Sequence, residues 1–380
     1  MSVPYPEVIL KSGKDQSLKR FHPWVFSGAI AKLPDGLQEG DLVVVKNSAA
    51  KIMGIGHFQI GSIQVRMLSF KEEAVSRDFW YRRLSAALAH RRAMGLLDHP
   101  DHDMYRLVHG EGDALPGLII DIYGALAVVQ CHSIGFFHVR STIAELLMEL
   151  LPSLRAVYDK SAHSLPFKAP IETNDTYLIG EPQAWTAQEY GNTYQIGVEE
   201  GQKTGFFIDQ RENRALLQSM AKGREVLNTF SYTGGFSVAA LRGGAKLVHS
   251  VDSSQKAIAL AEQNVAINFS DPVPHQAMVA DVFKFIKKIK DRYDLIVLDP
   301  PAFAKHRRVL PQALKGYRSI NQQAFEQIRQ GGILFTFSCS QVVSKDDFRR
   351  AVFTGAAIAR REVKIIHQLS QPPDHPISIY

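Results

Sequence analysis

The side chains best suited to chemistry in this chain are Cys339 and Asp299. Cys339 lies in the sequence FSCS, after the apolar run at residues 333–337, and Asp299 opens the sequence DPPAF, after the apolar run at residues 293–298. A cysteine thiolate is a strong nucleophile when a basic or helix-dipole environment lowers the pKa of its thiol. Its addition to C6 of a pyrimidine would turn C5 into an enamine carbon that can attack a methyl sulfonium. We therefore predict that Cys339 is a nucleophile, although lone cysteines are more often buried and inert.

The loop DPPAFAKHRR, residues 299–308, is suited to holding a nucleobase and its phosphates. Its two consecutive prolines keep the backbone extended, so that Asp299 and Phe303 are presented rigidly. The carboxylate can hydrogen-bond a polar base edge, the aromatic ring can stack on the base, and the basic cluster at residues 305–308 can bind phosphates. The pattern is typical of methyl transfer to nucleobases. The alternative is a rigid surface loop with a solvated basic run.

A sheet must position these side chains, and the stretch EVLNTFSYTGGF, residues 225–236, predicts its first strand, turn and helix. Val226 and Leu227 suit a buried parallel strand, and the glycines let a ligand approach backbone N–H groups at a helix N-terminus. The dinucleotide fingerprint GxGxxG is absent, so nothing here indicates a pyrophosphate. Taken alone, the stretch would indicate a tight turn without a ligand.

Further predicted strands each end in a carboxylate. The runs at residues 247–251, 276–280 and 293–298 are followed by Asp252, Asp281 and Asp299. Because parallel strands end at the ligand-binding edge of an open α/β sheet, these carboxylates predict a nucleoside-type site, with Asp252 at the ribose. Asp281 taken singly is better explained as a helix N-cap. A parallel fifth strand at residues 333–337, beside the fourth, would bring Cys339 near Asp299.

Length, charge and cysteine content limit the class of protein. The 380 residues suffice for two or three domains, and a net charge of +6 with a pI of about 9.1 is compatible with a polyanionic partner. The two cysteines exclude a disulfide framework and a cysteine-rich zinc site, and we predict no bound metal. Cys131 lies in a strand-like run and is expected to be a buried small hydrophobe. No run suits a membrane span or a signal peptide, so we expect a cytoplasmic protein.

The chain is predicted to form three domains. Residues 1–75 alternate short β-like runs with turns, as in a small β-barrel. Basic and aromatic residues interleave there up to Trp24, which favours RNA binding, although a core Trp24 beside solvated lysines is about as consistent with the pattern. Residues 76–190 predict an α+β domain that opens with a helix at about residues 77–94. Residues 191–380 predict a doubly wound α/β domain.

These motifs together resemble the family of large-subunit ribosomal-RNA cytosine-C5 methyltransferase I. The resemblance rests on VLNTFSYTGGFSVAAL, KTGFFIDQREN, DPPAFAK, GYRSIN and FSCS. HPWVFSGAI is similar to the family's N-terminal PUA domain, and GEGDALPGLIIDIYG to its central domain. The resemblance implies a Rossmann-like class I methyltransferase domain, S-adenosyl-L-methionine as cofactor, and 5-methylcytosine in 23S (large-subunit) ribosomal RNA as product, with Cys339 as nucleophile.

The resemblance also implies roles for individual residues. Asp209 and residues 230–235 would face the methionine part of the cofactor, Asp252 its ribose and Asp281 its adenine, with Asp299 beside the target base. The residues predicted to bind the cofactor are Asp209, Asn228, Phe230, Tyr232, Thr233, Gly234, Asp252, Asp281, Asp299 and Pro300. Those predicted to bind RNA are Arg20, Trp24, Phe303 and Lys305, and those predicted to be catalytic are Cys339 and Asp299.

The sequence departs from the family in its catalytic loop and near residue 380. Pro301 and Ala302 stand where many RNA cytosine-C5 methyltransferases carry a second cysteine that assists product release, so another base or water must serve. The usual closing hairpin is not apparent after His375, so the chain is expected to stop early, without the last sheet strand. The rival functions are purine N-methylation on the same fold, with Cys339 as a packing residue, and a non-catalytic RNA-binding or ribosome-assembly factor. The sequence does not decide whether the protein forms a homodimer.

Overall fold

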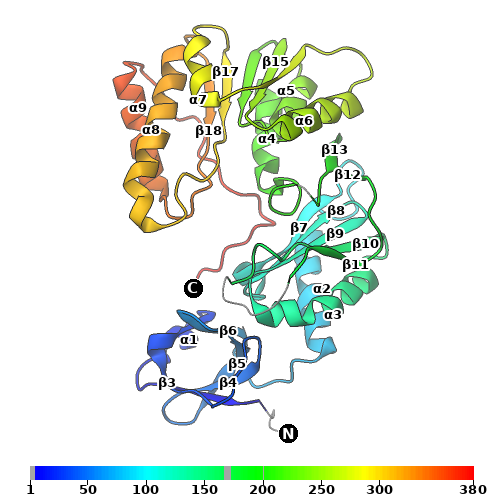
Figure 1. The fold of residues 1–380 in the computed structure, drawn as a ribbon, viewed down its shortest axis with the longest axis vertical. Coiled ribbons are helices and arrows are strands. Elements are labelled where there is room, and N and C mark those ends of the chain that lie inside the picture. Colours follow the sequence, from blue (N-terminus) through cyan, green and yellow to red (C-terminus); the bar gives the residue numbers. More distant parts are fainter. Residues whose placement is uncertain (1–4, 167–172, 200) are drawn as a thin grey trace. The chain divides into compact units, whose positions relative to one another are not determined.

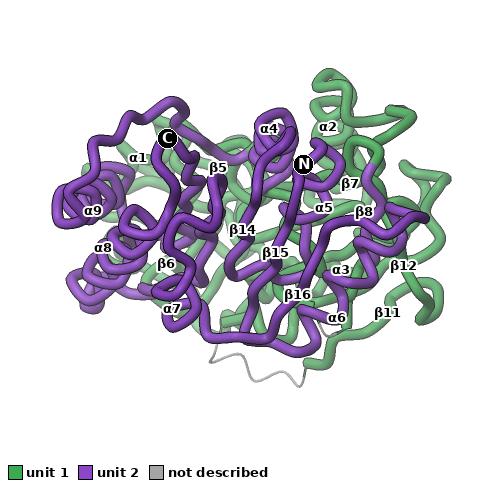
Figure 2. Tube along the Cα trace, turned by 90° about the horizontal axis from the view of Figure 1, so that it is seen from above, with its two compact units in different colours: residues 1–191, 196–209, 372–380 green, residues 192–195, 210–371 purple. Residues whose placement is uncertain are grey.

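The chain divides into two compact units in a computed structural model that describes residues 5–166, 173–199 and 201–380. Unit 1 contains Met1–Gly191, Ile196–Asp209 and Pro372–Tyr380 (Figure 2). Unit 2 contains Asn192–Gln195 and Gln210–Gln371. The chain therefore leaves unit 1 and returns to it more than once.

Unit 1 begins with a six-stranded sheet of short strands in the order β2-β6-β5-β4-β1-β3. The strands are β1 (Glu7–Leu10), β2 (Trp24–Phe26), β3 (Ile30–Lys32), β4 (Leu42–Lys46), β5 (Ile52–Phe58) and β6 (Ile63–Ser69), with the short helix α1 (Gln16–Lys19) and the 3-10 turn η1 (Ser27–Ala29). Alternate strand residues, such as Val8 and Leu10 or Val43 and Val45, are buried in one core. This is the small β domain that the apolar runs predict.

The central part of unit 1 is an α+β arrangement, as expected. Its sheet has the order β11-β10-β9-β8-β7. The elements are α2 (Arg77–Ala93), β7 (Met104–His109), η2 (Gly110–Asp113), β8 (Leu118–Tyr123), β9 (Leu126–Cys131), α3 (Ile134–Leu150), β10 (Ala156–Asp159) and β11 (Thr176–Ile179), followed by β12 (Trp185–Glu189). The next strand, β13 (Asn192–Ile196), lies in unit 2 except for its last residue. Helix α2 buries Phe79, Leu84 and Leu88 at helical spacing, and Ser76 caps it by accepting from the Phe79 N–H. Cys131 is fully buried, and burial raises the pKa of its thiol to about 12, so it is a packing residue.

Unit 2 is a doubly wound α/β fold around five parallel strands in the order β16-β15-β14-β17-β18. Figure 1 labels three of these strands, β15, β17 and β18, among the helices of the unit. The strands are β14 (Glu225–Thr229), β15 (Leu247–Asp252), β16 (His275–Val279), β17 (Leu295–Leu298) and β18 (Ile333–Thr336). The helices are α4 (Arg211–Met220), α5 (Gly235–Arg242), α6 (Gln255–Asn268), α7 (Val282–Phe285), α8 (Leu310–Gln327) and α9 (Lys345–Ile358), with the 3-10 turns η3 (Ile208–Gln210), η4 (Ile286–Lys288) and η5 (Arg307–Val309).

Helices cover both faces of this sheet. On one face Leu227 and Ile296 pack against Ile286 of η4 and Ile320 of α8. On the other face the Asn228 amide donates to Ser237 of α5 over 2.9 Å. Burial on both faces explains why the strands are nearly continuous apolar runs, as parallel strands generally are.

The segment after α9 forms no helix or strand in the described part of the chain. Asp374 and His375 are nevertheless buried, and they lie in unit 1. The Arg91 guanidinium, itself fully buried, donates to the Asp374 carbonyl over 2.8 Å, and the Arg106 N–H donates to the Asp374 carboxylate over 2.9 Å. None of the described helices is long and apolar enough to cross a membrane.

Buried histidines make the stability of unit 1 depend on pH. Burial lowers the pKa of His57 to about 3, with a smaller contribution from His138. As the pH falls from about 6.5 to 5, the unfolded chain takes up a proton at His57 that the folded chain rejects, so the free energy of unfolding should fall with a slope that approaches about 1.4 kcal/mol per pH unit from this residue. Chemical denaturation across this range should show a shallower pH dependence in His57→Gln than in the natural chain. Equal slopes would contradict the assignment.

Candidate active site

The strand order places a ligand-binding edge between β14 and β17. From β14 the chain adds β15 and then β16 on one side of the sheet, and it then crosses over to add β17 and β18 on the other side. The direction of winding therefore reverses between β14 and β17. Such a switch point opens a crevice at the carboxyl ends of the strands. The register aligns Thr229, Leu298 and Thr336 across the sheet, and the Thr229 hydroxyl donates to the Val297 carbonyl over 2.6 Å. Residues 230–235, 299–303 and 337–340 therefore leave the sheet at the same edge.

The turn after β14 has an unusual backbone. Phe230 and Tyr232 have φ of 53° and 46°, and Gly234 has φ of 77°. Left-handed conformations are costly for aromatic residues, and such strain is concentrated at functional sites. A Cβ on Gly234 would lie 2.9 Å from the Ala261 Cβ of α6, so glycine is also required by close packing. Thr233 is buried in this turn, and its carbonyl accepts from the Asn264 amide over 2.8 Å.

Asp252 is held by backbone donors where β15 ends. Its Oδ2 accepts from the Tyr232 N–H over 3.0 Å, and its Oδ1 accepts from the Ser254 N–H over 2.9 Å. The carboxylate thus ties β15 to the strained turn while staying partly exposed. Asn228 of the neighbouring strand β14 is buried, and its amide donates a hydrogen bond to the Ser237 hydroxyl.

Asp281 is exposed and caps helix α7, accepting from the Lys284 N–H over 3.2 Å. The N-cap interpretation is therefore correct for this residue. Phe283, which the sequence reasoning did not single out, follows on α7 with 36% of its surface exposed. Its ring centroid lies 6.1 Å from those of both Phe230 and Phe303, which places an aromatic surface at the edge of the sheet. The position of this aromatic residue, two residues after the carboxylate at a strand end, could have indicated it.

The two candidate catalytic segments lie together, as the sequence predicts. Cys339 is exposed, and its Sγ lies 3.6 Å from the Pro300 carbonyl oxygen, next to Asp299. The Gln210 amide donates to Asp299 Oδ2 over 3.1 Å and in turn accepts from the Asn213 amide over 2.6 Å. Gln210 and Asn213 were not predicted, because their spacing carries no pattern that points to Asp299.

Ser340 fastens the cysteine segment to the proline loop. The Ala304 N–H donates to the Ser340 hydroxyl over 3.2 Å, and the Tyr317 hydroxyl of α8 lies 2.9 Å from the same oxygen. Phe303 is half-buried, and its ring centroid lies 4.6 Å from that of Tyr317, with the two rings tilted by 37°. Lys305 follows, exposed, at the start of the basic run.

Two known protein families match separate ranges of the chain. The family described as S-adenosylmethionine-dependent methyltransferase matches residues 156–378, and the family described as PUA-like domain matches residues 8–70. The chain belongs to the S-adenosylmethionine-dependent methyltransferase family. Two relatives named ribosomal RNA large subunit methyltransferase I, from Erwinia tasmaniensis and Alteromonas mediterranea, are 39% and 40% identical to it. The alignments cover 97% and 98% of this chain and 94% of each relative.

Solved structures agree with this fold. A candidate SAM-dependent methyltransferase from Streptococcus mutans superposes with a TM-score of 0.81 at 23% identity, covering 98% of this chain and 95% of that chain. A candidate methyltransferase crystallised with SAH gives a TM-score of 0.83 at 24% identity, covering 98% and 96%. The fold class and the cofactor expected from the sequence, S-adenosyl-L-methionine, are thereby confirmed.

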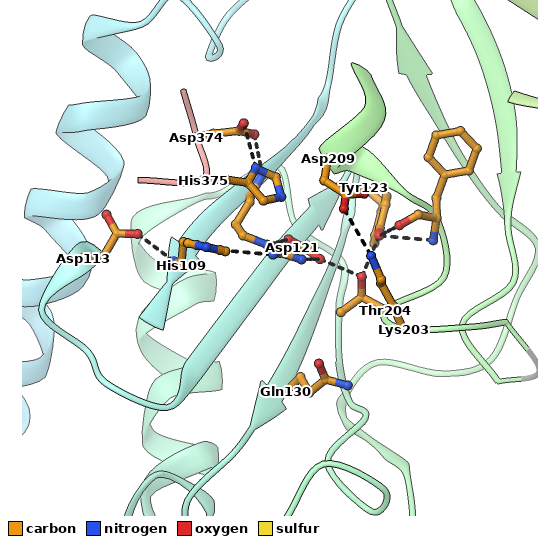
Figure 3. A network of polar contacts seen from close by, with 12 residues as sticks. His109, Asp113, Asp121, Tyr123, Gln130, Lys203, Thr204, Asp209, Asp374 and His375 are labelled. Carbon is orange, nitrogen blue, oxygen red and sulfur yellow. Dashed lines mark hydrogen bonds and ion pairs between the residues drawn. The ribbon is translucent and has the colours of Figure 1, made fainter. Parts of the chain in front are cut away.

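A buried polar network in unit 1 of the methyltransferase fixes the segment that contains Asp209 (Figure 3). Asp121 of β8 is fully buried and accepts from Arg106 over 2.7 and 2.8 Å and from the Thr204 hydroxyl over 2.6 Å. The Tyr123 hydroxyl lies 2.8 Å from the Thr204 hydroxyl, accepts from the Phe206 N–H over 3.3 Å and donates to the Phe206 carbonyl over 3.1 Å. The central sheet therefore holds the backbone that leads to Asp209.

Asp209 itself is held as a carboxylate. Burial alone would raise its pKa, but Lys203, 3.2 Å away, lowers the pKa below its ordinary value together with His375 and Arg106. The chain enters unit 2 at the next residue, Gln210, which contacts Asp299.

The predicted RNA-binding residues of the PUA-like domain differ in exposure. Arg20 is exposed. Trp24 is half-buried, and its indole N–H donates to Glu111 over 2.9 Å while the Arg66 guanidinium lies 5.8 Å from its ring. The most exposed rings beside it are Phe21 and Phe26, at 52% and 47%.

Replacing Gly234 should weaken cofactor binding. Gly234→Ala combines a strained φ of 77° with a clash at Ala261, whereas the control Gly223→Ala has φ of 72° and no atom within 4 Å of the added Cβ. Both variants should be destabilised by about 1 kcal/mol because of backbone strain. Only Gly234→Ala should also bind S-adenosylmethionine about tenfold more weakly or worse, because the turn must shift. Calorimetric titration measures this, and equal affinities in the two variants would contradict the placement of the cofactor.

Removing the Tyr123 hydroxyl should destabilise unit 1. Tyr123→Phe deletes the hydrogen bonds to Thr204 and Phe206, each worth about 1 kcal/mol when buried. Thermal denaturation should show a lower midpoint, whereas the control Tyr81→Phe, at a ring that is 36% exposed, should leave it unchanged. A Tyr123→Phe midpoint equal to that of the natural chain would show that the network does not hold the segment.

Proposed function

We propose that this methyltransferase forms 5-methylcytosine in large-subunit ribosomal RNA, with Cys339 as nucleophile and Asp299 beside the target base. The observation that carries the proposal is the exposed Cys339 thiol, 3.6 Å from the Pro300 carbonyl and adjacent to Asp299 at the switch point. The names of the relatives support ribosomal RNA of the large subunit as substrate. The PUA-like domain supports RNA as the partner, and we expect the enzyme to act in the cytoplasm.

The residues at the sheet edge fit S-adenosylmethionine. Gly234 allows the left-handed φ of the turn and its close packing on α6, and a glycine turn of this kind at a strand end is where nucleosides bind in α/β sheets. In the proposal Asp252 binds the ribose hydroxyls, Asp281 the adenine amine, and Phe283 packs against the adenine ring. Asp209 and the remaining predicted residues of the turn, Phe230, Tyr232 and Thr233, face the methionine part. Asn228 supports the turn from within the sheet, and Pro300 borders the pocket. The cofactor supplies the methyl group as a sulfonium electrophile, which an enamine carbon at C5 of cytosine can attack.

The chain's own residues make C5 reactive. The Cys339 thiolate adds to C6, forming the S–C6 bond and moving the electron pair of the C5=C6 bond onto C5. Asp299, oriented by Gln210, accepts from the exocyclic amine of the cytosine and holds the ring in place. Phe303 packs against the flipped base, and Lys305 contacts a neighbouring phosphate.

Product release requires loss of the C5 proton, after which the S–C6 bond breaks and the thiolate leaves with its electron pair. Many RNA cytosine-C5 methyltransferases use a second cysteine for this proton, but Pro301 and Ala302 occupy the loop here. Water at the exposed edge of the sheet is the base that the proposal assigns to this step.

Loss of the Cys339 thiol should abolish methyl transfer. Cys339→Ala should lower the rate by roughly three orders of magnitude or more, because no covalent adduct can form. The control Cys131→Ala removes the other, fully buried thiol and should keep the activity. The assay is transfer from labelled S-adenosylmethionine to unmodified large-subunit ribosomal RNA, followed by digestion and mass spectrometry of the nucleosides.

The outcomes separate the proposal from its rivals. Label in 5-methylcytosine, together with trapping of the natural chain on RNA that contains 5-fluorocytosine, supports the mechanism. Label in a methylated purine that persists in Cys339→Ala would assign the enzyme to N-methylation instead. Cofactor binding without any transfer would favour a non-catalytic RNA-binding or assembly role.

A further inference from the structure

A basic surface continues from the catalytic loop onto helix α8. Arg307 and Arg308 lie in η5, directly before α8, and Lys315 and Arg318 lie on the helix; all four are exposed. We call these four residues the α8 basic face. No aspartate or glutamate occurs between Pro300 and Phe325 in the sequence. The face therefore carries one sign of charge only.

The charges of the α8 basic face are not compensated within the protein. Some exposed cations elsewhere in the chain have carboxylate partners, such as Arg77 with Glu149 at 2.7 Å and Arg82 with Glu73 at 3.0 Å. Within residues 5–166, 173–199 and 201–380, by contrast, no carboxylate forms an ion pair with any member of the face. An uncompensated cluster of this kind raises the local positive potential and favours a polyanion.

Helix α8 is not stabilised by the two arginines that precede it. Arg307 and Arg308 precede the first turn of α8, where the helix dipole presents its positive end. Cations at this end are unfavourable, whereas anions are stabilised there. The local stability of α8 therefore does not explain the arginines, but binding of an anionic ligand would.

Packing makes the face a rigid platform beside the catalytic loop. A Cβ on Gly355 of α9 would lie 2.9 Å from the Gln322 nitrogen and 3.0 Å from the Arg318 carbonyl, so the two helices are in close contact. Tyr317, buried between Arg318 and the core, contacts Phe303 at 4.6 Å and Ser340 at 2.9 Å. The helix that carries the cations is thus fixed to the loop that carries Asp299.

We infer that the α8 basic face binds the sugar-phosphate backbone of the RNA strand next to the target nucleotide. This inference rests on the proposed function for its choice of RNA. From Arg308 to Lys315 the helix rises about 10 Å, at 1.5 Å per residue. That distance spans about three nucleotides of a stacked strand, at 3.4 Å each. The face thus extends the phosphate contact of Lys305 away from the catalytic loop and positions the strand without reading its sequence.

The test compares two charge-matched double variants. Lys315→Gln/Arg318→Gln removes two cations from the face. Lys222→Gln/Lys290→Gln removes two exposed cations that precede β14 and β17, at the opposite edge of the sheet. Filter binding of unmodified, transcribed large-subunit ribosomal RNA is measured over a series of salt concentrations, with calorimetric titration of S-adenosylmethionine as the control for folding.

The α8 variant should bind the RNA about tenfold more weakly or worse, and the slope of log affinity against log salt should fall by about 0.7 to 0.9 for each phosphate that is no longer neutralised. Its KM for RNA should rise while its affinity for S-adenosylmethionine stays unchanged. Equally weakened binding in both double variants would show general charge attraction and overturn the inference, as would unchanged binding in both. If light scattering shows that the natural chain is a dimer and that only the α8 variant is a monomer, the face would be assigned to contact with a second copy of the chain instead. Because binding is measured directly, a natural chain that binds RNA without methylating it would reject the proposed function and not this surface.

Discussion

The parallel pairing of β14 with β17 is the constraint on which the candidate site depends. It aligns the end of the strand before the strained turn with the end of the strand before Asp299, and the Thr229 hydroxyl bond to Val297 fixes that alignment. β18 extends the same register, so Cys339 leaves the sheet beside Pro300. Neither the carboxylates nor the thiol could be brought together by local sequence alone, since the segments that carry them are far apart in the chain.

Support for this edge comes from polar contacts that are buried or partly buried. Ser340 joins the cysteine segment to the proline loop and to α8, and Asp252 joins β15 to the turn after β14. In unit 1, the pair of Asp121 with Arg106 organises the segment that carries Asp209. Each of these groups satisfies several donors at once, which is what makes a buried polar network rigid.

The sequence predicts the sheet and its acidic strand ends because apolar runs, glycines and carboxylates occupy characteristic positions in a parallel sheet, namely the strands, the turns and the strand ends. Cys339 near Asp299 follows from that logic, and so does Asp281 as a helix cap. The positive φ of Phe230 and Tyr232 could not be predicted, because no local preference of these residues favours it and the surrounding packing imposes it. The contacts of Gln210 with Asp299 and of Trp24 with Glu111 depend on tertiary packing, and side-chain identity alone does not indicate them.

The burial of Asp374 and His375 in unit 1 bears on how the chain is made. Arg91 and the Asp374 carbonyl that it binds are 283 residues apart in sequence, and the whole of unit 2 is synthesised between them. On a ribosome, the central domain emerges with the local partners of Arg91, the Asp113 carboxylate and the Arg106 carbonyl, whereas Pro372–Tyr380 is synthesised much later. Such long-range contacts form late and slow the completion of folding. Unit 1 thus begins to fold before unit 2 and finishes after it, and neither unit can be obtained by a single cut of the chain.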